Sequence, residues 1–259
     1  MERMDYFIEL YGSLPRAGPG DNASTRRALA AMKHLPPAPR ILDIGCGPGM
    51  QTVELLRQSG GTVLALDLLP QMIARVRRAA QVAGVINRLE TLQIDMHQME
   101  FPPNSFDAVW SEGAIYFLGF RNGLAKVQPF VKPGGYVAVS EAVWLQPDPP
   151  LEAIAFWQEY SEIDDIGRKL AVISELGYEN IEHFVLPPAS WTELYYRPLL
   201  ARASESADKW RGISAAEDVL EEARHEVAVF ERNSRYFSYA FFVMRKPTTA
   251  QEERHHDSH

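Results

Sequence analysis

The chain has 259 residues, a formal net charge of −8 and one cysteine, Cys46. An acidic chain without a run of Lys or Arg lacks the broad positive surface that nucleic-acid binding needs, so we expect no nucleic-acid partner. One cysteine excludes an intrachain disulfide, and no apolar run has the length of a signal-peptide core or a membrane span. We therefore expect a cytoplasmic protein with a single domain over residues 1–246.

Residues 40–143 alternate between short apolar runs and longer segments with helical spacing. Most of the runs are apolar almost throughout, which is typical of strands buried on both faces of a sheet. The predicted strands are 40–45, 62–67, 89–95, 106–112 and 135–143. Between the second and third strands, residues 70–84 place apolar side chains on one face of a predicted helix. This alternation predicts a doubly wound α/β fold with a mostly parallel sheet.

The chain on either side of this alternation is more helical. The expected segments are an N-terminal helical cap (1–38), a helical lid or insertion after strand five (144–232) interleaved with a sixth strand (180–188), a last strand (235–246) and a disordered tail (247–259). Ser190 with Glu193, and Ser214 with Glu217, have the spacing of capping boxes. Each pair therefore predicts the start of a helix.

The segment ILDIGCGPGM joins the first predicted strand to the next helix. The apolar strand runs to Asp43, and Gly45, Gly47 and Gly49 follow at alternate positions. Glycines at such a turn let the backbone approach a ligand closely, and the helix N-terminus favours a polar or anionic group. A nicotinamide-dinucleotide fingerprint needs a small residue where this chain has Met50, so that alternative is disfavoured.

The D-x-G-x-G-x-G order resembles the first motif of the class I S-adenosylmethionine-dependent methyltransferases. That family places an acidic residue at the end of the second strand for the ribose hydroxyls, where this chain has Asp67, and another after the third strand near the adenine, where it has Asp95. The resemblance implies a seven-stranded sheet, S-adenosyl-L-methionine as cofactor and S-adenosyl-L-homocysteine as product. The cofactor-binding residues that it implies are Asp43, Gly45, Cys46, Gly47, Gly49, Asp67, Leu68, Asp95, Met96, His97 and Ser111.

More narrowly, WSEGAIY and GGYVAVSEAVW resemble methyltransferases of ubiquinone and menaquinone biosynthesis and a group of bacterial methyltransferases without a secure substrate. Enzymes that methylate nucleic-acid bases have an Asn/Asp-Pro-Pro-aromatic motif where this chain has Ser111 to Ala114. Catechol-type enzymes gather Asp-Asp-Asn around a divalent metal, and the sequence shows no such arrangement. The resemblance therefore implies methyl transfer to a small-molecule acceptor at O, N, S or C, without a metal.

Four residues are candidates for orienting or deprotonating the acceptor. Glu112 ends the fourth strand, Tyr116 follows one helical turn later, and Glu141 lies near the end of the fifth strand. A carboxylate beside the cationic sulfonium gains charge complementarity and can act as a general base. Tyr11 precedes a Gly- and Pro-rich segment of a kind that similar enzymes fold over the cofactor. The sequence leaves open whether Glu112 contacts the cofactor or the acceptor.

Two other functions stay open on the sequence alone. A cofactor-binding or regulatory partner without catalysis fits the same motifs, and a nicotinamide-dependent oxidoreductase on a similar sheet is a weaker alternative. The aromatic residues of the insertion fit either a substrate lid or a contact between the two copies of a homodimer.

Overall fold

The computed structural model describes residues 1–160 and 162–248, which contain one sheet of order β3-β2-β1-β4-β5-β8-β7, with a short β6 paired to β5. The strands are β1 Arg40–Ile44, β2 Thr62–Asp67, β3 Leu89–Gln93, β4 Phe106–Glu112, β5 Val131–Trp144, β6 Asp164–Asp165, β7 Glu179–Val185 and β8 Phe237–Arg245. All of them pair in parallel except β8, which is antiparallel to β5 and β7. The predicted fold is confirmed, and β6 is an addition to the seven expected strands.

Both faces of the central strands are buried, which explains the nearly continuous apolar runs in the sequence. In β1, Ile41 belongs to one apolar cluster and its neighbour Leu42 to the other. Helices α2, α3 and α4 contribute to the first cluster, and α5 and α7 to the second. Their bounds are α2 Asn22–Ala31, α3 Met50–Ser59, α4 Pro70–Val82, α5 Phe120–Val127 and α7 Ile166–Glu175. With both faces covered, the strand ends are where a ligand can reach the sheet.

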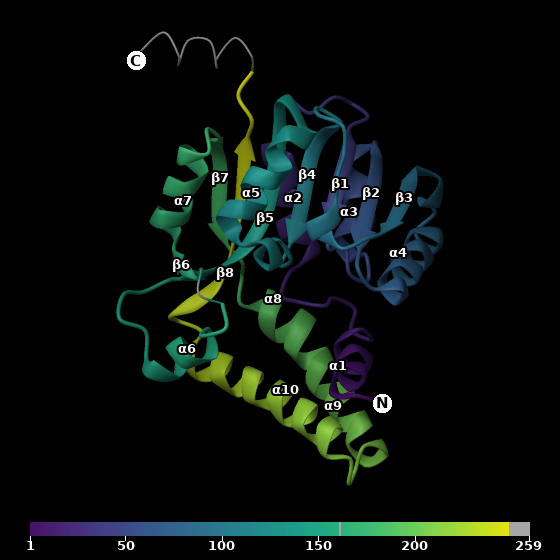
Figure 1. The fold of residues 1–259 in the computed structure, drawn as a ribbon, viewed down its shortest axis with the longest axis vertical. Helices are drawn as coiled ribbons and strands as arrows, with labels where there is room; N and C mark the ends of the chain where they lie inside the picture. Colours follow the sequence, from purple (N-terminus) through teal and green to yellow (C-terminus); the bar gives the residue numbers. More distant parts are fainter. Residues whose placement is uncertain (161, 249–259) are drawn as a thin grey trace.

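A second layer of helices lies below the sheet in Figure 1, at the carboxyl ends of the parallel strands. It consists of α1 Arg3–Tyr11, α6 Leu151–Phe156, α8 Ala189–Trp191, the π-helical turn Thr192–Tyr196, α9 Arg197–Lys209 and α10 Ser214–Asn233, which we call the lid. The ring of Tyr6 in α1 meets that of Trp210 edge-on at 5.3 Å between centroids, which joins the N-terminal helix to the lid core. The longest lid helices lie between β7 and β8, after the sixth long strand of the chain.

Both predicted capping boxes are wrong in detail. Helix α8 begins at Ala189, and the hydroxyl of Ser190 donates to Asp21, far away in the sequence, instead of capping its own helix. Helix α10 begins at Ser214 itself, with Ile213 as its N-cap and no side-chain cap. Tertiary contacts therefore override the local signal at the first site, and the helix starts one residue earlier than predicted at the second.

The predictions of no membrane span and of a disordered tail can be compared with the structure only over the described residues. No helix within residues 1–160 and 162–248 combines the length and apolarity that crossing a membrane requires. The disordered tail was predicted for 247–259, and residues 249–259 of it lie outside the described residues.

Candidate functional site

The glycine-rich loop after β1 lies where the strand order reverses between β1 and β4. Its backbone requires glycine, because Gly45 and Gly49 have φ of 67° and 93°. A Cβ on Gly45 would lie 2.4 Å from the Cβ of Ala114, and one on Gly49 would lie 2.5 Å from Val76. Gly49 is also the N-cap of α3, so the loop ends in backbone N–H groups at a helix N-terminus.

Asp67 at the end of β2 holds this loop in place. One carboxylate oxygen accepts the N–H of Gly47 at 2.9 Å and the other accepts the N–H of Leu69 at 3.0 Å. Burial raises the pKa of Asp67, and these backbone donors oppose the rise. A carboxylate offers about four lone-pair sites, so both oxygens can still accept a ligand hydroxyl. Leu68 beside it is 59% exposed and presents an apolar side chain at the same edge.

Asp43, Cys46 and Ser111 were predicted to bind cofactor, but their side chains face the protein interior. Asp43 is fully buried, with one oxygen accepting from the Thr52 hydroxyl at 2.5 Å and the other without a hydrogen bond. Burial, and then the charge of Glu112, raise the pKa of Asp43 to about 7. Burial also raises the pKa of the Cys46 thiol, so this cysteine is a poor nucleophile. The Ser111 hydroxyl donates to the carbonyl of Ile44, which ties β4 to β1.

The predicted adenine-side residues lie on the turn after β3. Asp95 caps the short helix Met96–Gln98 and accepts from the His97 N–H at 2.8 Å. This hydrogen bond lowers the pKa of Asp95. The Cε of Met96 lies 3.6 Å from where a Cβ on Gly45 would be, so Met96 adjoins the glycine-rich loop. The His97 side chain is mostly exposed and contacts Asp95.

The segment between α1 and α2 lies over the glycine-rich loop. Ala17 is the side chain nearest to Gly47, and the Arg75 guanidinium donates to the carbonyls of Gly12 and Leu14. Asp21 accepts from the Ser190 hydroxyl of the lid. The segment is thus fastened both to α4 and to the lid, and it covers the carboxyl ends of β1 and β4.

Glu112 belongs to a buried network that we call the paired cluster: Arg16, Thr25, Trp110 and Glu112. One oxygen of Glu112 accepts from the Thr25 hydroxyl at 2.7 Å and from the Trp110 indole at 2.9 Å. The other accepts from the Arg16 guanidinium at 3.0 Å, and the two charged side chains are only 6% and 4% exposed. Glu112 is therefore neutralised and hydrogen-bonded inside the protein. Sequence reasoning missed Arg16, which lies 96 positions away in the chain.

A second polar group, the lid cluster, comprises Tyr11, Tyr116, Glu141, Tyr160, Glu226 and Tyr239. Glu141 is 1% exposed, and one of its oxygens accepts the N–H of Ala142 while the other has no hydrogen bond. Glu226 accepts from the Tyr11 hydroxyl at 3.1 Å. Burial raises the pKa of both carboxyl groups. The structure thus places three of the four predicted acceptor-side residues in this cluster and Glu112 in the paired cluster.

Glu226 and the nearby Lys169 were missed, although the sequence carries a signal for both. Each lies in the apolar stripe of an amphipathic helix: Glu226 lies between Ala223 and Phe230 of α10, and Lys169 between Ile166 and Ile173 of α7. A charged residue in an apolar stripe is rarely buried without a purpose. Burial lowers the pKa of the Lys169 ammonium, which donates to the carbonyl of Glu162 at 2.7 Å.

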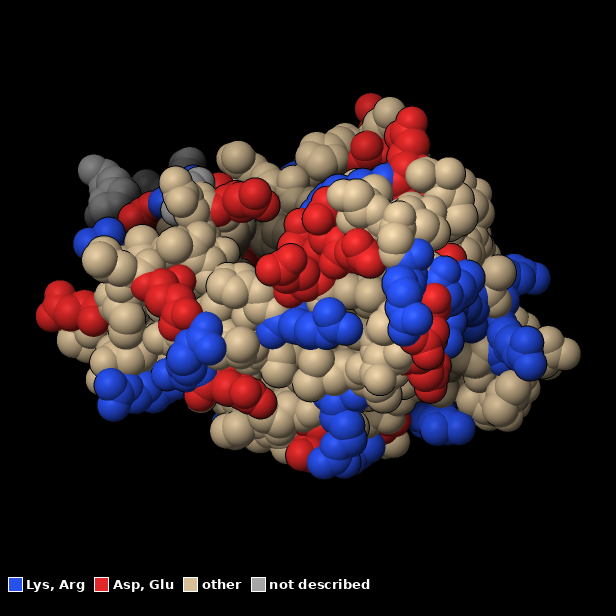
Figure 2. Space-filling model, turned by 90° about the horizontal axis from the view of Figure 1, so that it is seen from below, with Lys and Arg blue, Asp and Glu red and all other residues tan. Residues whose placement is uncertain are grey.

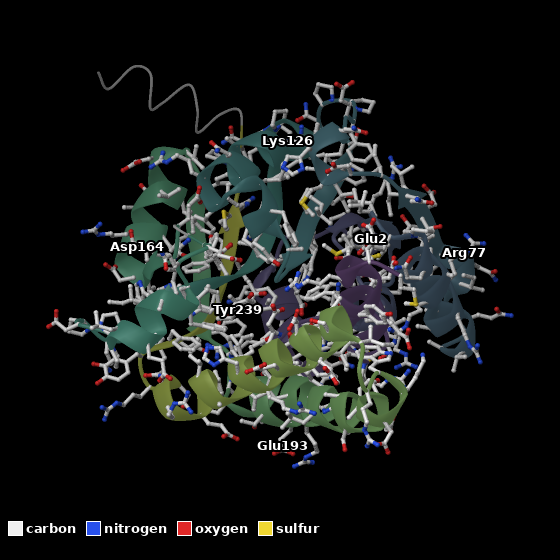
Figure 3. The ribbon with its side chains drawn as sticks, turned by 60° about the horizontal axis from the view of Figure 1, so that its bottom comes forward. Glu2, Arg77, Lys126, Asp164, Glu193 and Tyr239 are labelled. Carbon is white, nitrogen blue, oxygen red and sulfur yellow. The ribbon has the colours of Figure 1, made fainter. Side chains whose placement is uncertain are left out.

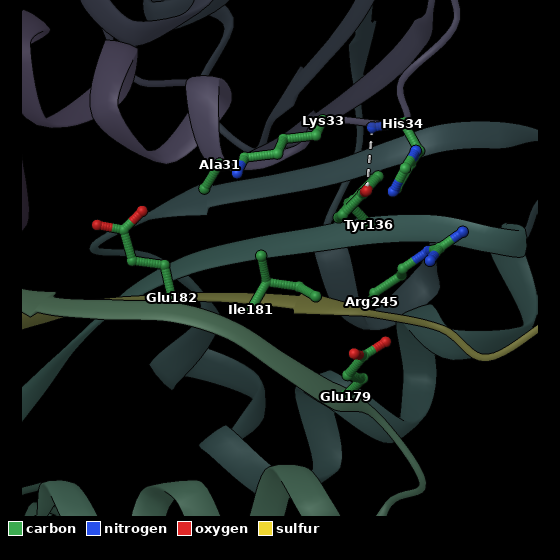
Figure 4. A pocket seen from close by; sticks show the side chains of 8 residues that line it. All are labelled: Ala31, Lys33, His34, Tyr136, Glu179, Ile181, Glu182 and Arg245. Carbon is green, nitrogen blue, oxygen red and sulfur yellow. Dashed lines mark hydrogen bonds between the residues drawn. The ribbon is translucent and has the colours of Figure 1, made fainter.

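The sheet also has a hollow of about 320 Å³ at its opposite edge, beside the start of β7 (Figure 4). Its lining mixes Lys33, His34 and Arg245 with Glu179 and Glu182. The charges are of both signs, and the hollow lies away from the glycine-rich loop. Within the described ranges no group of three or more His, Cys, Asp or Glu side chains is arranged to hold a metal ion.

Comparison with known proteins agrees with this geometry. Residues 41–135 match a family model described as a methyltransferase domain. The sterol 24-C-methyltransferase ERG6B of Gibberella zeae is 31% identical over 130 residues, which are 47% of this chain and 34% of that protein. The 27-O-demethylrifamycin SV methyltransferase of Amycolatopsis mediterranei is 26% identical over 240 residues, which are 88% of this chain and 85% of that protein.

The match extends to the fold of the whole chain. A SAM-dependent methyltransferase from Geobacter sulfurreducens, solved with S-adenosyl-L-homocysteine, has a TM-score of 0.81 and 19% identity over 93% of this chain and 97% of that one. By contrast, the chain matches only 28% to 52% of the length of the sterol methyltransferases similar to it. The glycine-rich loop and most of the acidic strand ends lie within the matched residues. Residues 41–135 therefore match a methyltransferase domain, and the chain as a whole shares the fold of a SAM-dependent methyltransferase.

Proposed function

We propose that the chain transfers a methyl group from S-adenosyl-L-methionine to a small-molecule acceptor. One observation carries the proposal: the positive-φ glycine loop, held by Asp67 at the strand-order switch, lies within the residues that match a methyltransferase domain. The rifamycin relative, similar over most of both chains, is named for a small-molecule acceptor. The single cysteine and the negative net charge support a cytoplasmic enzyme without a nucleic-acid partner.

The residues at the loop fit the cofactor by chemical type. The free lone pairs of Asp67 would accept the ribose hydroxyls, and Leu68 and Met96 would provide apolar contacts for the adenine. The backbone N–H groups at the start of α3 would face the carboxylate of the methionine moiety. The segment between α1 and α2, fastened by Arg16 and Arg75, would exclude water from above.

When bound, the cofactor supplies a methyl group on a positively charged sulfur. The protein contributes position, dehydration and a destination for a proton. The Tyr116 phenol stays protonated at neutral pH, because burial and then Glu141 and Glu226 raise its pKa to about 12. The two carboxylates of the lid cluster, whose pKa values are raised, are therefore the bases available to take a proton from the acceptor.

Calorimetric titrations with S-adenosyl-L-homocysteine and with NAD test the proposal. We expect the homocysteine nucleoside to bind, NAD not to bind, and Asp67→Ala to weaken the binding at least tenfold. Glu90→Gln, an exposed change on the neighbouring strand β3, is the matched control and should bind as the parent does. Binding of NAD without S-adenosyl-L-homocysteine would overturn the proposal. A screen of small molecules with the labelled methyl donor then tests turnover, and binding without any turnover would favour the non-catalytic alternative.

A further inference from the structure

The buried Glu141 and the half-buried Glu226 of the lid cluster have no cation in ion-pair contact, unlike Glu112 and Glu54. Glu112 pairs with Arg16, and Glu54 pairs with Arg26. Among the described residues, no Lys, Arg or His nitrogen lies within ion-pair distance of Glu141 or Glu226. Burial raises the pKa of Glu141, and the charge of Lys169 opposes that rise. The Lys169 ammonium nevertheless donates to the Glu162 carbonyl and lies over the Phe120 ring at 4.4 Å instead of forming an ion pair with Glu141.

Two further observations show that this region has unused polar capacity. One oxygen of Glu141, 1% exposed, and the hydroxyl of Tyr196, 2% exposed, have no hydrogen bond of normal geometry. Burial raises the pKa of both groups, and nearby polar groups modify the rise: Tyr160 opposes it at Glu141, and Glu226 adds to it at Tyr196. A buried polar atom without a partner is costly, and native proteins keep few of them. These atoms can therefore form hydrogen bonds with a ligand that binds in the lid cluster.

Aromatic rings connect the two carboxylates. The rings of Tyr116 and Tyr160 meet at 5.7 Å between centroids, and Tyr239 meets Trp191 at 5.1 Å. Burial raises the pKa of Tyr116 and Tyr239, and the charges of both Glu141 and Glu226 add to the rise. Tyr116 and Tyr239 are thus close to both carboxylates, and Figure 3 shows Tyr239 between the sheet and the lid helix α10.

The lid cluster adjoins the proposed methyl-donor site. The Tyr239 ring lies 3.2 Å from where a Cβ on Gly113 would be, and Gly113 directly follows β4. The next residue, Ala114, packs against Gly45 of the glycine-rich loop. Seen from the lid side, the molecule has a recess bordered by acidic side chains (Figure 2). A ligand beside Tyr239 would therefore lie next to Gly113 and Ala114, which border the proposed methyl-donor site.

We propose that the lid cluster binds the acceptor and that this acceptor is a small molecule with a basic amine, held as an ammonium ion. The inference rests on the proposed methyl transfer and adds the class of acceptor. An ammonium ion compensates two desolvated carboxylates, donates to tyrosine oxygens and is attracted to aromatic faces. A neutral alcohol satisfies hydrogen bonds but leaves the charges unpaired, and an anionic acceptor adds a third negative charge.

The amine must lose a proton before it reacts. The ammonium R–NH3+ gives one proton to Glu141 or Glu226, leaving R–NH2 and a neutral carboxylic acid. The nitrogen lone pair then forms the N–C bond to the methyl group while the C–S bond breaks and its electron pair stays on sulfur. The product R–NH2+–CH3 is again an ammonium ion, so it leaves the site once the carboxyl group has returned its proton to solvent.

The test compares phenethylamine with 2-phenylethanol, two probes of similar size, by calorimetric titration with and without saturating S-adenosyl-L-homocysteine. We expect the amine to bind at least tenfold more tightly than the alcohol. Glu226→Gln and Glu141→Gln should each remove most of this preference and keep S-adenosyl-L-homocysteine affinity. Glu222→Gln, one turn earlier on α10 and paired with Arg3 at the surface, is the matched control and should keep the preference.

Equal affinity for the two probes, or no measurable binding of either, would overturn the amine assignment. A preference for the amine that survives both glutamine substitutions would overturn it as well. Because S-adenosyl-L-homocysteine is titrated separately, failure of the proposed methyltransferase function shows in that titration and is distinguished from failure of the amine site.

Discussion

The paired cluster and the lid cluster treat buried carboxylates in opposite ways. Glu112 has a hydrogen-bond donor or a cation for every oxygen, all supplied by the chain itself. Glu141 and Glu226 have hydroxyl and backbone donors but no cation in ion-pair contact, although the charge of Lys169 opposes the rise that burial causes in the pKa of Glu141. The paired cluster thus has all its hydrogen-bond partners within the chain and stabilises the N-terminal segment. The proposed acceptor would supply the partner that the free oxygen of Glu141 lacks in the lid cluster.

The largest effect on stability is expected from Glu112→Ala. The substitution leaves the Arg16 guanidinium buried without its partner, and breaking one side of a buried ion pair costs about 3–5 kcal/mol. Urea unfolding measures the loss, with Glu205→Ala on the exposed face of α9 as the control. A loss no greater than that of the control would mean that the paired cluster does not hold the N-terminal segment.

The next largest effect concerns Asp43, which lies beside the paired cluster but has no cation of its own. Its pKa rises from 3.8 to about 7 on folding, so between these values the native state binds more protons than the unfolded state. Stability therefore falls as pH increases through this window and is level above it. Asp43→Asn should remove that fall. The free energy of unfolding of the variant, relative to that of the parent, should therefore rise by up to ~4 kcal/mol between pH 4 and pH 7. Parallel unfolding curves at the two pH values would contradict the assignment.

A smaller effect of the opposite sign to that of Glu112→Ala is expected from Glu141→Gln. The change removes a buried charge without a cation and keeps a polar side chain, so we expect unfolding at pH 7 to become harder by about 1–2 kcal/mol. Amine binding should weaken at the same time, because the variant lacks the negative charge of Glu141 that attracts the ammonium ion. Thermal unfolding in the absence of ligand measures the first effect. A destabilised Glu141→Gln would indicate that Lys169 already compensates the carboxylate.

The smallest effect is expected at the surface of the lid. Glu222 pairs with Arg3 while both side chains are about half exposed, and solvent screens such a pair. Glu222→Gln should leave the denaturation midpoint and the binding of both probes unchanged. A clear shift in either would mean that the α1–α10 contact positions the lid cluster.

The fold and the cofactor loop were predictable from sequence because their signals are local. Apolar runs buried on both faces, the glycines at alternate positions after β1 and Asp67 at the end of β2 each depend on neighbouring residues. The fold itself was confirmed by the structure. The assignment of individual cofactor contacts stays a prediction, and the buried positions of Asp43, Cys46 and Ser111 show that a motif residue can support the loop from beneath.

The site's charge balance was not predictable, because it depends on residues far apart in the chain. Nothing near Glu112 in sequence indicates that Arg16 will neutralise it, and nothing near Tyr11 indicates Glu226. The lost capping role of Ser190 has the same cause, since Asp21 of the N-terminal segment takes its hydroxyl. Of these residues, Glu226 alone has a local signal in the sequence, because a charged residue there lies in the apolar stripe of an amphipathic helix.

The most direct test of this account is urea unfolding of Glu112→Gln and Glu141→Gln at pH 7, side by side with the parent chain and without ligands. Both changes replace one buried carboxylate by an amide of nearly the same size, so packing differs little between them. We predict opposite signs: Glu112→Gln lowers the free energy of unfolding and Glu141→Gln raises it. A loss of stability in both variants would contradict the claim that the lid cluster holds an uncompensated charge for its ligand.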